Sequence, residues 1–168
     1  MRSSSINNII GVDRMFDNDD QGSNQTTILN SLTATLMDSV NGYRDAAENA
    51  EGSQFQELFR QNAMERERVA GELRGEISRL GGNPDDDGTV LGKTHQRFLD
   101  LKAAVMGRDD KAIINEVERG EDYLKEKFET ALADDGLSSE SRSIVERAYE
   151  SVRKGHDQIS QLKHGLEA

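Results

Sequence analysis

The chain of 168 residues has no cysteine and only one proline, Pro84. Without cysteine, disulfide bonds, thiolate metal sites and thiol catalysis are all excluded, and a reducing compartment is favoured. Any catalytic or metal chemistry would have to use histidine and carboxylate side chains. Proline interrupts helices, so a chain with one proline, 34% hydrophobic and 32% charged residues has the composition of long helices with solvated outer faces.

The sequence also lacks long apolar runs and basic clusters. No window approaches the roughly 18 consecutive apolar residues of a membrane span, and the N-terminus has no apolar core of a signal peptide. We therefore expect a soluble, cytoplasmic protein with no membrane partner. The 21 basic residues stand against 32 acidic ones, which gives a formal net charge of −11. Because this charge repels a phosphate backbone, nucleic acid is not an expected partner.

Apolar residues recur at intervals of three and four along most of the chain, which predicts an all-α fold. The helices that this periodicity predicts cover residues 27–50, 53–80, 89–106, 111–133 and 138–164. Residues 1–25 are rich in serine, asparagine, aspartate and glycine, so we expect a flexible N-terminal tail ahead of one helical domain, 26–168.

The predicted connections indicate the topology. Short turns join the first two long helices and the last two, whereas about 30 residues, including the short fifth helix, separate the second long helix from the third. A connection of that length lets the second and third long helices run parallel, as in ferritin-like bundles. We therefore predict a ferritin-like four-helix bundle with a long crossover that contains the fifth helix.

Several short motifs resemble one known family, and their order covers most of the chain. The motifs are GYRDAAE at 42–48, EL at 72–73 leading to LGG at 80–82, His95 with LKAA at 101–104, and ERGED at 118–122. In these residues the chain is similar to the bacterial ferritin-like four-helix-bundle family of unknown function that carries the label DUF2383. The resemblance implies the ferritin-like fold and a bacterial setting, leaves a stress-associated role open, and supplies no established reaction.

Three ionisable residues, Arg66, Glu121 and His156, interrupt the apolar stripes of three different predicted helices. An ionisable side chain aimed at a core must be hydrogen-bonded, charge-paired or metal-bound, because a buried polar group left unpaired costs roughly 1–3 kcal/mol. We expect a structural network in which the three residues pair across the bundle. The alternative is a weak site for one divalent cation with Glu121 and His156 as ligands, although the charge of Arg66 would repel that cation.

A working di-iron or di-manganese enzyme is a further alternative. Such bundles carry a glutamate on each of two helices and Glu-x-x-His on each of the other two. Here Glu65 is followed three residues later by Arg68, and His156 is preceded three residues earlier by Arg153. The first-helix glutamate of ferritin-like enzymes is replaced by Leu36. Because the dinuclear motif is absent, we expect no catalytic residue and no cofactor, with iron or manganese bound only under the alternative hypothesis.

Four glycines inside predicted helices, Gly71, Gly75, Gly120 and Gly155, are candidate positions for close helix contacts. Glycine inside a helix costs about 1 kcal/mol relative to alanine, so a packing reason is expected. If the crossover helix does not cover Gly71 and Gly75, a second copy of the bundle could. The sequence thus predicts a non-catalytic cytoplasmic bundle that acts by assembly or partner binding. The alternative is a metal-binding oxidoreductase or iron-handling protein with a degenerate site.

Overall fold

The computed structural model describes residues 3–84 and 109–167, in which all regular secondary structure is helical and no strand occurs. The helices are α1 (Ser3–Asn49), α2 (Ser53–Arg79), α4 (Asp110–Ala133) and α5 (Ser139–Glu167). Within these ranges, none of the helices combines the length and the apolarity that a membrane span requires. The predicted helix at 89–106 and the His95 and 101–104 motifs lie outside the described residues.

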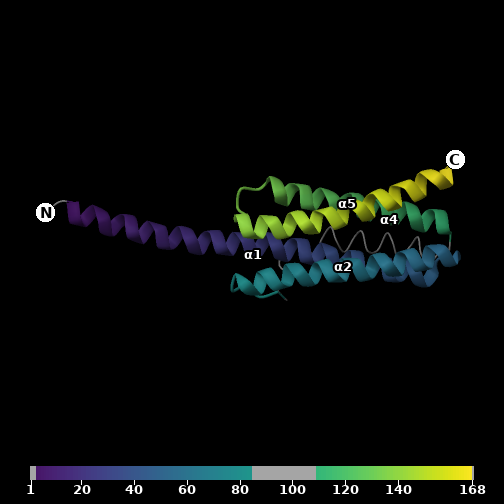
Figure 1. Ribbon diagram of the computed structural model, residues 1–168, viewed down its shortest axis with the longest axis horizontal. Helices are drawn as coiled ribbons and strands as arrows, with labels where there is room; N and C mark the ends of the chain where they lie inside the picture. The colour runs from purple at the N-terminus through teal and green to yellow at the C-terminus, as the bar shows by residue number, and fades with distance from the viewer. Residues whose placement is uncertain (1–2, 85–108, 168) are drawn as a thin grey trace.

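The four helices pack side by side as a bundle (Figure 1). α1 packs against α2 and α4, and α5 packs against α4 and α2. The Asp110 carboxylate at the start of α4 accepts hydrogen bonds from the backbone N–H groups of Glu51, at 2.8 Å, and Gly52, at 3.1 Å, just before α2. At the other end, Glu76 of α2 accepts a hydrogen bond of 2.9 Å from Ser141 of α5. Hence α2 and α4 run parallel, as the connection length predicts.

The first helix starts much earlier than predicted. α1 begins at Ser3, whereas the sequence predicts a helix only from residue 27. Figure 1 shows this N-terminal part of α1 running past the end of the other helices. A helix that is already nucleated adds one hydrogen bond per residue, so a polar segment can extend a helix that packing stabilises from Leu29 onward. The predicted helix start is therefore wrong, while the flexibility of residues 1–25 stays a prediction.

The other helix boundaries lie close to those predicted. α2 and α4 each begin and end within one residue of their predicted ranges, and α5 ends at Glu167 rather than at residue 164. Local chemistry explains the ends. Asp109 caps α4 by accepting a hydrogen bond of 3.1 Å from the backbone N–H of Lys111. After α2, Gly81 adopts a φ of 82°, a left-handed conformation that glycine tolerates and that ends the helix.

The interior consists of two hydrophobic clusters that follow each other along the bundle axis. One cluster includes Phe128, the other includes Phe59, and all four helices contribute residues to each. Arg66 lies between the two clusters along α2, and Glu121 lies between them along α4. Both charged side chains are almost fully buried, with exposures of 1% and 2%. The core is therefore divided by a polar layer, and this layer is the candidate site.

Candidate functional site

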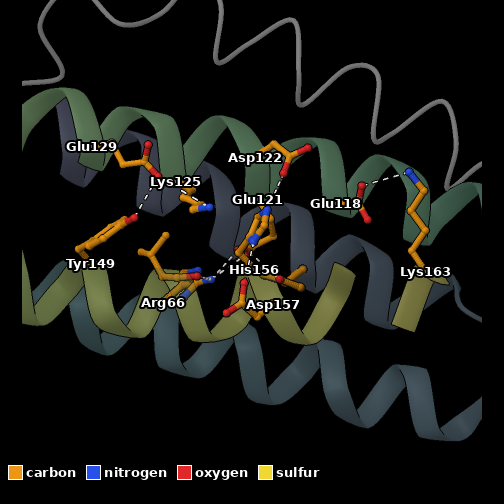
Figure 2. A network of polar contacts seen from close by, with 12 residues as sticks. Arg66, Glu118, Glu121, Asp122, Lys125, Glu129, Tyr149, His156, Asp157 and Lys163 are labelled. Carbon is orange, nitrogen blue, oxygen red and sulfur yellow. Dashed lines mark hydrogen bonds and ion pairs between the residues drawn. The ribbon is translucent and has the colours of Figure 1, made fainter. Parts of the chain in front are cut away.

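The polar layer is built around an ion pair between Arg66 and Glu121. The Nη2 atom of Arg66 donates to both Glu121 carboxylate oxygens, at 3.0 Å to Oε1 and 2.8 Å to Oε2. The same guanidinium donates to two backbone carbonyl oxygens of α5, at 3.3 Å to Ser151 and 3.4 Å to Val152. Arg66 therefore connects α2 to α4 and α5 through the middle of the core (Figure 2).

Tyr43 brings α1 into the same layer. Its hydroxyl donates to Oε1 of Glu121 at 2.6 Å, and the ring is buried. Burial raises the pKa of Tyr43 well above its ordinary value of 10.0, and the neighbouring Glu121 carboxylate raises it further. The phenol therefore stays protonated and acts as a donor. In the sequence Tyr43 stands out only as part of the GYRDAAE motif at 42–48, although a tyrosine in a buried stripe usually needs a hydrogen-bond partner for its hydroxyl.

The buried arginine keeps its charge. Burial lowers the pKa of Arg66, but the charge of Glu121 and the hydrogen bonds to it raise the pKa more, so that it lies above its ordinary value. The layer thus contains one cation and one anion in direct contact. A buried charge left without its partner is strongly destabilising, typically by 3–5 kcal/mol, whereas a complete pair is tolerated. The positive charge of Arg66 and the negative charge of Glu121 therefore balance each other within the core.

Gly155 provides the space that the guanidinium occupies. A Cβ atom at this position would overlap Nη2 of Arg66, so with any larger residue the guanidinium would have to shift. Gly155 is therefore a position where α5 comes into close contact with Arg66 of α2. At the other three predicted positions, Gly71, Gly75 and Gly120, an added Cβ would meet nothing within 4 Å in the described part of the chain.

His156 does not join the buried pair. In the described structure its ring nitrogens contact two aspartates: Nε2 lies 2.6 Å from Oδ1 of Asp122 on α4, and Nδ1 lies 3.2 Å from Oδ1 of Asp157 on α5. Burial lowers the pKa of His156, but the hydrogen bonds to Asp122 and Asp157 more than offset this, and the pKa lies above its ordinary value of 6.5. Of the three predicted network residues, the structure brings together Arg66 and Glu121 and places His156 elsewhere.

Glu121 and His156 do not fit a shared metal ion. Both carboxylate oxygens of Glu121 accept hydrogen bonds from Arg66, whose positive charge opposes a second cation. A raised pKa favours the protonated form of His156, which has no lone pair for a metal. Among the described residues, no group of three or more histidines and carboxylates is placed to hold an ion. We therefore assign no metal ligand here.

A second buried polar contact was not predicted. Glu76 on α2 is buried, accepts the hydrogen bond from Ser141 of α5, and pairs with Arg79 one turn later. The Arg79 hydrogen bond lowers the pKa of Glu76 most, and Ser141 contributes to the same shift. Arg79 also reaches Glu140 of α5 at 3.1 Å. This cluster joins the end of α2 to the start of α5.

In residues 3–84 and 109–167, the fold and the site define a class: a bundle of four long helices whose core is bridged by a buried arginine–glutamate pair. A family model for a domain of unknown function (DUF2383) matches residues 24–134. The match spans more than half of the chain, so the protein belongs to this family. The matched range includes Tyr43, Arg66 and Glu121 and ends before α5, which carries Gly155 and His156. No curated protein matches the sequence.

Proposed function

We propose that the protein is a non-catalytic, ferritin-like helical bundle that acts through its surface, by assembly or by binding a protein partner. The observation that carries this proposal is the Arg66–Glu121 pair at the centre of the core. In ferritin-like metal proteins, inward-facing carboxylates at the middle of the bundle hold the metal ions. Here a guanidinium neutralises the carboxylate at that level, and Tyr43 binds the same carboxylate.

The ferritin-like part of the proposal rests on topology. α2 and α4 run parallel, and 30 residues, 80–109, lie between the end of α2 and the start of α4. A simple up-and-down bundle has only short loops between antiparallel neighbours, whereas ferritin-like bundles have one long crossover. The topology supports the ferritin-like class, and fold alone does not assign a reaction.

A metal-content measurement tests the non-catalytic proposal. The protein is purified from medium supplemented with iron and manganese, and bound metal is measured by elemental analysis. We expect much less than one equivalent per chain, because a cation would have to displace Arg66 from Glu121. One or two equivalents that are lost in Glu121→Gln but retained in Glu126→Gln, an exposed residue of the same helix, would overturn the proposal.

The surface that we propose for assembly lies on the outer face of α2. Gly71 and Gly75 are exposed there, and Met64, with 71% of its surface exposed, lies on the same face by helical periodicity. Light scattering coupled to size-exclusion chromatography measures assembly directly. We expect Gly71→Glu combined with Gly75→Glu to shift the protein towards the monomer, while the control Gly120→Glu on α4 does not. A dimer that survives the double substitution in a folded protein would contradict this surface.

A further inference from the structure

His156 lies between two carboxylates, one on each ring nitrogen. Asp122 of α4 faces Nε2 at 2.6 Å, and Asp157 of α5 faces Nδ1 at 3.2 Å. Only the doubly protonated imidazolium can donate to both, since the neutral ring has one N–H and one lone pair. Loss of the proton therefore turns one of the two hydrogen bonds into a contact between a lone pair and a carboxylate. The geometry itself favours the protonated state.

The same residues lie directly outside the buried pair. Asp122 follows Glu121 on α4, and His156 follows Gly155, against which Arg66 rests. The imidazole side chain is 15% exposed, so it lies at the edge of this layer of the core. Lys125 of α4 is a further charged group near His156, and it lowers the pKa of His156 against the two aspartates.

Other contacts continue the row between α4 and α5. Lys163 binds Glu118 at 3.1 Å, and the hydroxyl of Tyr149 donates to Glu129 at 2.9 Å (Figure 2). Lysine and tyrosine titrate near pH 10, and the pKa values of Lys163 and Tyr149 are raised further by their surroundings. In this row, His156 is the group that changes charge near neutral pH.

We propose that His156 is a proton-controlled latch between α4 and α5. The imidazolium holds Asp122 against α5 and closes the bundle over the Arg66–Glu121 pair. When the proton is lost, the neutral ring can donate to only one of the two aspartates and no longer attracts either by charge, so the hold on Asp122 weakens, α4 separates more easily from α5 at this level, and water reaches the polar layer. The latch would let the protein respond to a change in pH around neutrality without any bound ligand.

The direction of the pH dependence follows from linkage. The folded protein binds the His156 proton more tightly than the unfolded chain does, so the contribution of the latch is fully present below the unfolded pKa of 6.5. The contribution is lost as the pH rises from 6.5 through the folded pKa. Each unit between the two pKa values corresponds to up to about a tenfold change in the opening equilibrium constant.

The test combines two NMR measurements on the full-length chain. Titration of the ring signals gives the pKa of His156, and hydrogen exchange at residues 152–159 of α5, corrected for intrinsic rates, gives the opening equilibrium constant. We expect a pKa above 6.5 and an opening constant that rises several-fold from pH 6 to pH 9. In Asp122→Asn the pKa of His156 should fall, and in His156→Gln the opening constant should lose most of its pH dependence.

A matched control is His164→Gln, an exposed histidine near the end of α5, which should behave like the wild type. Equal pH dependence in the wild type and in His156→Gln would overturn the proposal. A pKa of His156 at or below 6.5 would do the same. If His156→Gln does not fold, the pKa of His156 in Asp122→Asn decides: an unchanged value shows that Asp122 does not hold the proton.

Discussion

Two neighbouring carboxylates of α4 make ion contacts with other helices, one with α2 and one with α5, and they differ in burial. Glu121 is 2% exposed and meets the guanidinium of Arg66, while the side chain of Asp122, the next residue, is 59% exposed and meets His156. The buried carboxylate also binds Tyr43, and its arginine reaches two backbone carbonyls. Burial therefore determines how many protein partners a charged group requires. Water can supply the remaining hydrogen bonds only at the exposed contact.

The difference also determines what each contact can do. The attraction within a buried pair is unscreened, but its two charges have lost their hydration, so removing one partner costs much more than the pair contributes. An exposed pair contributes little, and it remains accessible to salt and protons. The inner contact is thus suited to fixing the alignment of the helices, and the outer one to responding to conditions.

The largest expected effect comes from removing the buried anion. Glu121→Ala leaves Arg66 charged and buried without a counter-ion, so we expect the free energy of unfolding to fall by about 3–5 kcal/mol. Urea unfolding followed by circular dichroism measures this change. The control Glu126→Ala, at an exposed position of the same helix, should change it by less than about 0.5 kcal/mol. Equal effects would mean that the pair is not in a dry core.

A triple substitution distinguishes two contributions to the free energy of unfolding: the destabilisation by a buried charge without its partner, and the stabilisation by the intact Arg66–Glu121 pair. Replacing the layer with apolar residues by Tyr43→Phe, Arg66→Met and Glu121→Leu removes every charge, and such replacements are often neutral or stabilising. We expect most of the stability lost in Glu121→Ala to return. A triple variant as unstable as Glu121→Ala would show that the pair itself stabilises the fold.

The next largest effect concerns the glycine under the guanidinium. Gly155→Ala places a methyl group against Arg66, and we expect a loss of about 1–3 kcal/mol in unfolding free energy, as for other overpacked cores. The matched change Gly120→Ala on α4 meets nothing within 4 Å in the described structure and should stabilise by about 0.5–1 kcal/mol through helix propensity. A gain at both positions would show that the guanidinium moves aside at little cost.

The sequence predicts the helices, and which side of each helix faces the core, where apolar side chains recur at helical spacing. The apolar spacing places α2 and α4 within one residue of their observed ends, and it aims Arg66 and Glu121 at the same core. The N-terminal extension of α1 has no such pattern, so its helix was not predicted. Likewise, Glu76 is buried only because Ser141 and Arg79 meet it at the helix ends, which periodicity along one helix does not show.

The prediction for His156 fails for a specific reason. Between Val152 and Ile159 the inner position of α5 belongs to Gly155, which is buried, while His156 lies at the edge beside Asp122. Glycine has no side chain and does not count as apolar in the pattern, so the apolar stripe of α5 is assigned to His156 rather than to Gly155. The volume at that position is filled from another helix, by Arg66, and a pattern read along one helix cannot include that group.

The smallest expected effect distinguishes the two contacts by salt. At pH 6, where His156 is protonated, Asp122→Asn should lower the unfolding free energy by about 0.5 kcal/mol at low ionic strength, the usual range for solvent-screened pairs. In 1 M sodium chloride, with a Debye length of about 3 Å, that difference should fall towards zero. The loss in Glu121→Ala should stay nearly constant, because salt does not enter a dry core. Urea titrations of both variants at the two salt concentrations measure this, and a salt-insensitive Asp122→Asn would mean that the outer contact is as desolvated as the inner one.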